Sequence, residues 1–550
     1  MFANNVPLQP AKRQTGDATM TSRCRTRSGA AEKGYCVSVL DPLRALLAQD
    51  RLDEFVDLSV ERFSEIYNGP WREYADLVAT IDRNDLARFP EVMVISAAAS
   101  SWFEPHTALG WARVEHAVDL MKAIDALRAQ AAEETDPRRR LRSAGVELGA
   151  HRILSRSADA AVAAERWEAL VDELPAQALL ASAETVHVFG TQVVAAYAQE
   201  GRFPDAIRAA VRMHDDVSVW RRMHVRGMVA MSQALFGDIA AARRTLDRME
   251  SELQGLDVRS RYGATGWGIA AALVAVEDGD GERAHARLDE LDERLPAVDH
   301  WAYVLSARGR ALQLTHPADE AADILHELIA EHRGRRASEY ALDLLRSVSG
   351  DLLVASGQTE RAKELLQDAP ETGPSALAHS RALLRNDALA ARRRAAATLA
   401  QHEQSPRLTT EALLTITIAA SRLGLADEAR RMMSRLAGSL TRRGNTSVLR
   451  YAPRSDLLAL VSQDHPEIAA HVQALPEDHD AGIAEPAALT ASELRVLGAL
   501  LDEPGARAVA ERLYLSQNTV KTHLRNAYRK LGATDRASAL AIASRHGLLD

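Results

Sequence analysis

The fold of the C-terminal end is decided by residues 515–532, which read LSQNTVKTHLRNAYRKLG. Ser516 is placed to cap the start of a helix, and Gly532 is placed to end it. Four apolar residues recur at spacings of 4, 3 and 4 and so form one stripe on that helix: Val520, Leu524, Ala527 and Leu531. We therefore predict a helix over residues 517–531 with one buried face.

A basic face lies at another angle on the same helix. Lys521, Arg525 and Arg529 follow one another at i, i+4 and i+8, and Lys530 adds a fourth cation. Residues 516–531 contain no acidic side chain. Such a face suits contact with the phosphate-walled major groove of DNA, although it is also compatible with a helix surface that faces only water.

Shorter helices are expected on both sides of this segment. LTASELRVLGALL begins with a Thr490–Glu493 capping-box pattern and is expected to place Leu494, Leu497 and Leu501 on one face. A second helix is expected to end near Tyr514, and ATDRASALAIASRHGLL predicts a fourth. Four short helices in about 60 residues, with a tight turn between the second and the third, indicate a helix-turn-helix domain over residues 489–550.

The motifs LTxxELxVL and LSxNTVKTHxxNxYRKLGAxxRxxAL in this domain resemble the LuxR-type helix-turn-helix that ends many bacterial transcription regulators. Residues in frame with that pattern are Leu515, Ser516, Thr519, Val520, Lys521, His523, Lys530, Leu531, Gly532 and Arg536. The resemblance implies that Lys521, Thr522 and Arg525 face base edges. It also implies that five residues hold phosphates or support the helix: Ser516, Asn518, Thr519, Arg529 and Lys530. In this family the fourth helix is commonly a dimer contact.

Two features of the domain depart from the pattern or leave alternatives open. The usual Gly-x-Ser-Asn-Lys-Glu start of the second helix is replaced by EPGARA at residues 503–508, so polar groups that often cap or anchor this helix are absent. His523 is placed either to touch phosphate or to pack between helices.

Residues 40–475 are predicted to be helical throughout, because apolar residues recur at helical spacing and no alternating strand pattern occurs. A repeat runs through residues 201–429, in which a glycine that ends one helix is followed five residues later by an alanine. The pairs are Gly201–Ala206, Gly237–Ala242, Gly279–Ala284, Gly357–Ala362 and Gly424–Ala429, while His316–Ala321 and Asn386–Ala391 keep the frame without glycine.

The spacing of these anchors, near 35–40 residues, predicts stacked helical hairpins. The region resembles tetratricopeptide-like repeats, and with the C-terminal domain it resembles maltose-regulator-type proteins. Their ATPase is not expected here, because no GxxxxGK[ST] loop occurs. A generic alanine-rich bundle is the alternative. The tryptophans of the first half, such as Trp167, Trp267 and Trp301, either line an effector groove or fill helix interfaces.

Composition and charge limit the remaining choices. Residues 486–550 carry +3 and residues 1–36 carry +4, so the net charge of −9 leaves about −16 on residues 37–485. This negative charge disfavours DNA binding by that part of the chain. The only cysteines, Cys24 and Cys36, exclude a disulfide framework and a clustered zinc motif. Residues 1–36 are interpreted either as a disordered basic tail or as an arm that touches DNA. Residues 476–488 are interpreted as an acidic linker.

Together these patterns predict an all-α protein with a tetratricopeptide-like helical solenoid and a four-helix LuxR-type domain. The expected function is a bacterial, cytoplasmic DNA-binding transcription regulator. The expected partners are double-stranded DNA, a small-molecule or protein effector on the repeats, and a second copy through the C-terminal helix. No membrane contact, cofactor, metal or catalytic activity is expected. The alternative is a protein-interaction scaffold with a degenerate DNA-binding module.

Overall fold

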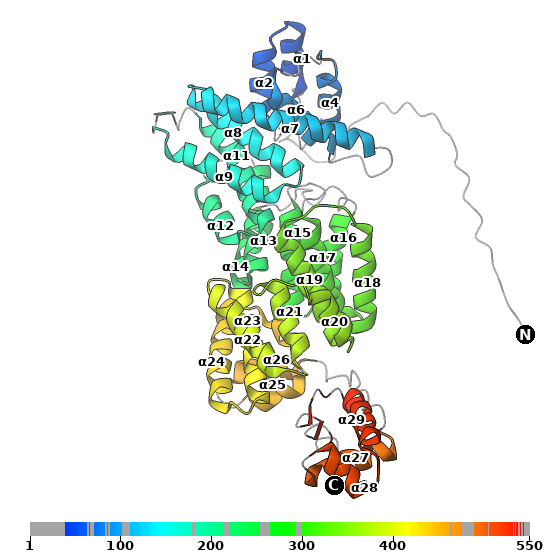
Figure 1. Ribbon diagram of the computed structural model, residues 1–550. Helices are drawn as coiled ribbons and strands as arrows, with labels where there is room; N and C mark the ends of the chain where they lie inside the picture. The colour runs from blue at the N-terminus through cyan, green and yellow to red at the C-terminus, as the bar shows by residue number, and fades with distance from the viewer. Residues whose placement is uncertain are drawn as a thin grey trace, which may run out of the picture.

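The computed structural model describes residues 39–543 except 63–64, 67–70, 83–84, 86–87, 102–109, 176, 179–181, 214–218, 253–263, 293–299, 385, 462–464, 476–488, 504, 532, 534, 537–538 and 541–542. Throughout these ranges the regular elements are helices, with no strand, which confirms the all-α prediction (Figure 1). The predicted tail at 1–36 and the predicted linker at 476–488 lie outside the described residues.

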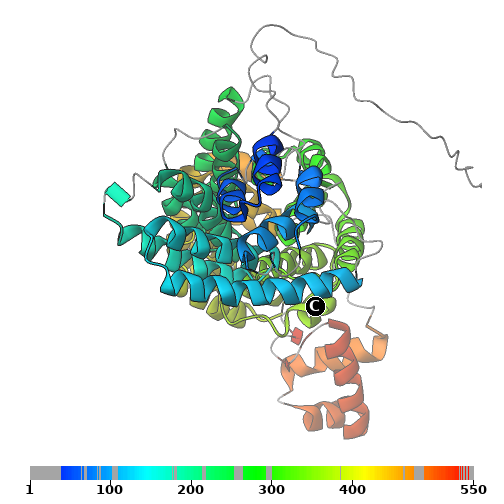
Figure 2. The same ribbon diagram turned by 90° about the horizontal axis from the view of Figure 1, so that it is seen from above.

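The first part of the body consists of helices before the repeat frame begins. They are α1 (Leu40–Ala48), α2 (Leu52–Glu61), α4 (Trp71–Val78), α6 (Pro90–Ser101), α7 (Gly110–Glu133), α8 (Pro137–Ile153) and α9 (Ser157–Asp172). The long helix α7 packs on α6 and α8, and α8 packs on α9 and α11, so this part joins the repeats without a break (Figures 1 and 2).

The middle of the body is a run of helix pairs, and each predicted anchor lies in the turn inside one pair. The pairs are α11 (Ala183–Glu200) and α12 (Phe203–Val211), α13 (Val219–Phe236) and α14 (Ile239–Glu252), α15 (Thr265–Glu277) and α16 (Gly281–Asp292), α17 (Trp301–Thr315) and α18 (Ala318–Glu331), α19 (Glu339–Ala355) and α20 (Thr359–Leu366), α21 (Pro374–Leu383) and α22 (Ala388–Gln401), and α23 (Pro406–Arg422) and α24 (Ala426–Arg443).

The glycine and alanine of the repeat do what their residue types predict. The five anchor glycines have φ between 73° and 94°, a left-handed conformation in which an L side chain is strained. The alanines five residues after the anchors are at most 2 % exposed, because each lies where the second helix packs on the first. At His316, which replaces glycine, α17 ends instead in extended backbone with φ −128°. The helical hairpins are thus present, and their kinship to tetratricopeptide repeats stays a resemblance.

The last helix pair also contacts an early pair of the run, which the repeat spacing did not predict. Arg407, at the start of α23, donates from Nε to the Leu235 carbonyl at 3.0 Å and from Nη2 to the Ala234 carbonyl at 2.9 Å. These carbonyls end α13, where donors within the helix run out, and the guanidinium adds hydrogen bonds from a distant part of the chain. Further contacts between the same parts are the Arg443–Asp238 ion pair and two hydrogen bonds from Ser447 to Glu277. We call this set of contacts the closure.

The three tryptophans with described side chains are buried in helix interfaces. Trp167, Trp267 and Trp301 are 3 %, 6 % and 4 % exposed, and the Trp167 indole donates to the Leu141 carbonyl. They act as core residues, which favours the packing interpretation over an aromatic groove for these three. The side chains of Trp102, Trp111 and Trp220 lie outside the described residues.

The body ends with a 3-10 helix, η3 (Thr446–Tyr451), and two short helices, α25 (Arg454–Leu460) and α26 (Pro466–Gln473). Beyond residue 488 come α27 (Ala491–Asp502), α28 (Ala506–Leu513) and α29 (Gln517–Leu531). These three helices pack on one another around a hydrophobic core of their own. They form a separate small module.

Candidate nucleic-acid interface

The module begins with the predicted capping box. The Thr490 hydroxyl accepts a hydrogen bond from the Glu493 backbone N–H at 3.3 Å, and the Glu493 carboxylate accepts one from the Thr490 N–H at 2.8 Å. Two N–H groups that α27 cannot satisfy internally are thereby paired, which fixes where the helix starts.

The buried face of α27 differs by part of a turn from the prediction. Leu497 is fully buried and Leu494 is partly buried, as predicted, but Leu501 is 48 % exposed. Val496 and Leu500 are buried in its place. Packing against α28 and α29 determines which face of α27 is buried. The spacing of the three leucines did not distinguish this face from the adjacent one.

Helix α29 has the predicted buried stripe. Val520 and Ala527 are fully buried and Leu524 is 9 % exposed, in the same core as Val509 of α28. Tyr528 lies at the edge of this core, and partial burial raises the pKa of its hydroxyl. One side of α29 is thus fixed to the module, and the side chain of Leu531 lies outside the described residues.

The turn that precedes α29 orients it. Tyr514 follows α28 with φ 54°, a left-handed conformation, and its side chain is 96 % exposed. The Ser516 hydroxyl then accepts a hydrogen bond from the Thr519 backbone N–H at 3.1 Å, which confirms the predicted cap. The sequence placed Tyr514 at the end of the second helix but did not reveal its strained backbone or full exposure.

The predicted polar contacts divide into two kinds. Ser516 and Thr519 bond to each other through their hydroxyls at 2.7 Å, and the Thr522 hydroxyl donates to the Asn518 carbonyl at 2.9 Å. These side chains therefore support the helix start in the free protein. Ser516, Asn518 and Thr522 are also exposed, and Thr519 is partly exposed.

Lys521 and Arg525 form the described part of the basic face. Both are exposed, one turn apart on α29, and neither has an ion-pair partner among the described residues. His523, between them, is half-buried. Arg529 and Lys530 belong to the last turn of α29 by their backbone, and their side chains lie outside the described residues.

The start of α28 shows the effect of the departure at residues 503–508. Gly505 is the N-cap and provides no side-chain hydrogen bond, so this helix begins without the polar cap that the family pattern supplies. Nearby cations are already paired: Arg507 with Glu511 at 3.2 Å and Arg512 with Glu503 at 3.5 Å. The exposed cations of the module without an ion-pair partner among the described residues are therefore Lys521 and Arg525 on α29 and Arg495 on α27.

Arg536 has a structural role that the motif alone did not reveal. Its Nη2 donates to the Leu500 carbonyl near the end of α27 at 2.6 Å, which ties the segment after α29 back to the first helix. Ala539 and Ala543 are buried in the module's core. The predicted fourth helix otherwise lies largely outside the described residues.

Within the residues that the structure describes, no group of three or more His, Cys, Asp or Glu side chains is placed to hold a metal ion. Within the same ranges, no helix combines the length and apolar character that crossing a membrane requires.

Comparison with known proteins agrees with the geometry of the module. Residues 487–543 match the family described as bacterial regulatory proteins, luxR family. The chain is 45 % identical over 62 residues to the probable transcriptional regulatory protein NarL of Mycobacterium tuberculosis, in strains CDC 1551 / Oshkosh and ATCC 25618 / H37Rv. The match covers 11 % of this chain and 29 % of the relative. The C-terminal module is a LuxR-family helix-turn-helix domain, and the match does not extend to the body.

Proposed function

We propose that this protein is a DNA-binding transcription regulator that inserts α29 into the major groove. The observation that carries the proposal is the position of Lys521 and Arg525. They are exposed one turn apart on a helix that has no carboxylate, and the opposite side of that helix is buried in the module. A helix held in this way presents cations to the groove without exposing its apolar side.

Within this proposal the residues of α29 divide into two roles. Lys521, Thr522 and Arg525 lie in its first half, where recognition helices usually meet base edges. Ser516, Asn518 and Thr519 lie at its N-terminus, where backbone N–H groups and hydroxyls suit phosphate. Arg529 and Lys530, in the last turn, are proposed to contact the backbone as well.

The body is proposed to control the module without a nucleotide and without catalysis. Its net charge of about −16 disfavours contact with DNA, and no phosphate-binding loop occurs in its sequence. Helical hairpins instead provide surfaces for an effector or a partner protein. DNA binding by the purified protein should therefore be independent of ATP. A second copy is proposed to bind through the segment after α29, which would place two half-sites on the DNA.

The test is selection of random duplex DNA by the full-length protein, followed by mobility-shift assays on the selected sites. Arg525→Ala should lower the affinity for the selected site by about 1–3 kcal/mol and relax base preference at one position. Arg495→Ala, which removes an exposed cation of α27 in the same module, is the control and should leave base preference unchanged. A protein that enriches no sequence is the scaffold of the alternative interpretation, and the proposal would then be wrong.

A further inference from the structure

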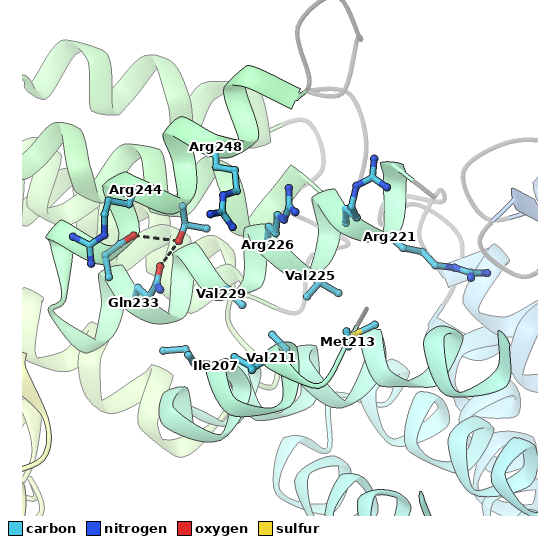
Figure 3. A pocket seen from close by; sticks show the side chains of 14 residues that line it. Ile207, Val211, Met213, Arg221, Val225, Arg226, Val229, Gln233, Arg244 and Arg248 are labelled. Atoms are coloured by element: carbon cyan, nitrogen blue, oxygen red, sulfur yellow. Dashed lines mark hydrogen bonds between the residues drawn. The ribbon is translucent and has the colours of Figure 1, made fainter. Parts of the chain in front are cut away.

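A cavity of about 400 Å³ opens between α12, α13 and α14 (Figure 3). Helices α12 and α14 both pack on α13, and the cavity lies over the face of α13 between them. Its size falls in the range of small-ligand sites, about 300–1,000 Å³.

The lining is divided between arginine and apolar side chains. The cations are Arg221, Arg222, Arg226, Arg244 and Arg248, and none of the described residues that line the cavity is acidic. The larger apolar side chains are Ile207, Val211, Met213, Val225 and Val229. Figure 3 shows Arg226, Arg244 and Arg248 on one side, and Ile207 and Val211 of α12 with Met213, which follows α12, on the opposite side. Val211 is 81 % exposed, which is unusual for a valine on a packed helix.

The cavity's arginines differ in whether the described residues give them an ion-pair partner. Glu252, outside the lining, pairs with Arg226 and lies 3.8 Å from Arg222. Arg244 and Arg248 lie one turn apart on α14, both exposed, and neither has an ion-pair partner among the described residues. Arg244 and Arg248 therefore place two exposed guanidinium groups at the edge of this cavity, on a body whose net charge is negative.

We infer that this cavity binds an organic anion, a carboxylate or phosphate carried on an apolar body. Arg244 and Arg248 hold the anionic group, because a planar guanidinium pairs with two oxygens of a carboxylate or phosphate at once. The apolar body covers Val211, Val225 and Val229 and removes them from water. A neutral apolar ligand leaves the arginines uncompensated, and a small inorganic anion leaves the valines exposed.

The site adjoins the closure, in which the pair of α13 and α14 contacts the last pair, α23 and α24. Asp238, in the turn between α13 and α14, pairs with Arg443 at the end of α24, and α14 itself contacts α24. Helix α24 leads through η3, α25 and α26 toward the C-terminal module. The binding site stands on the geometry alone, whereas its role as the effector site rests on the function proposed above.

The experiment is a fluorescence titration of the full-length protein with anilinonaphthalene sulfonate, an aromatic anion, and with phenylnaphthylamine, which has a similar apolar body and no charge. The variant is Arg244→Gln/Arg248→Gln. Neither of the two arginines that it replaces has an ion-pair partner among the described residues. It should bind the sulfonate at least about tenfold more weakly and the neutral amine as well as before. The matched control is Arg431→Gln/Arg435→Gln, two exposed arginines with the same spacing on α24, and it should bind both probes like the original protein.

Competition identifies the anionic group. Displacement of the sulfonate by decanoate alone assigns a carboxylate ligand, and displacement by decyl phosphate alone assigns a phosphate ligand. The inference is overturned if neither competes, if Arg244→Gln/Arg248→Gln binds the sulfonate normally, or if duplex DNA is the better competitor. The mobility-shift assay on selected DNA is scored separately, so a loss of this inference and a loss of the proposed function give different results.

Discussion

Replacing Gly237 by alanine should destabilise the body far more than the same change at Gly424. Both glycines are anchors of the repeat, with φ of 94° and 73°. They differ in what an added Cβ would meet. At Gly424 nothing lies within 4 Å, whereas at Gly237 the Cβ would lie 2.6 Å from the Arg407 backbone nitrogen and 2.8 Å from its Cα.

The magnitudes follow from these surroundings. An L-residue in the left-handed region costs about 1–2 kcal/mol, and the stiffer unfolded chain returns about 0.4–1 kcal/mol, so Gly424→Ala should cost about 0–1.6 kcal/mol. Gly237→Ala adds the cost of overpacking, about 1–3 kcal/mol, for a total of about 1–4.6 kcal/mol. Arg407 cannot move away freely, because its guanidinium is bonded to the carbonyls that end α13.

The assay is urea unfolding of the full-length protein followed by tryptophan fluorescence. All tryptophans lie at or before Trp301, so the signal reports the body and not the C-terminal module. The midpoint should fall clearly for Gly237→Ala and only slightly for Gly424→Ala. Equal midpoints for the two variants would refute the argument that the closure presses on the turn at Gly237.

Three other changes test separate parts of the structure. Arg529→Ala should weaken binding to all DNA sequences alike and reduce the slope of affinity against salt concentration by about one. Arg525→Ala should reduce the ratio of specific to nonspecific affinity. If a salt series gives the reverse pattern for the two variants, the proposed position of α29 in the groove is wrong. Arg381 pairs with Asp351 at 2.7 Å and both are buried, so Arg381→Ala should cost about 3–5 kcal/mol in urea unfolding, and a loss below 1 kcal/mol would contradict this. Burial, reinforced by the charge of Arg152, lowers the pKa of His300 to about 3. Because the unfolded chain takes up this proton near pH 6.5 and the folded chain does not, His300 should contribute a loss of stability of about 2 kcal/mol between neutral pH and pH 5. The pKa of His224 is lowered in the same way, so His300→Gln should reduce the pH dependence of unfolding without abolishing it.

The sequence predicted the features that depend on near neighbours. The capping box of Thr490 and Glu493, the cap at Ser516 and the glycine turns each depend on residues a few positions apart, so their geometry follows from residue type and spacing. The buried stripe of α29 was predicted for the same reason.

Features formed between distant helices were not predictable in this way. Arg407 meets carbonyls more than 170 positions away, and helical periodicity does not identify which distant helix a residue will contact. The arginines of the cavity lie on α13 and α14, and the valines lie on α12 and α13. Their proximity therefore depends on how the hairpins stack. Leu501 shows the same limit on a smaller scale, because its exposure was decided by the neighbours of α27.

The closure also sets an order on folding during synthesis. The Leu235 carbonyl can bond to Arg407 only after that residue is made, roughly 9–35 s later at about 5–20 residues per second. Repeats that contact only their neighbours can fold as they leave the ribosome, one after another. Here the pair of α13 and α14 is expected to lack the closure contacts until α23 is made. If the ribosome stalls after α14 and before α23, the nascent chain should therefore be cleaved by a protease more readily than the completed body.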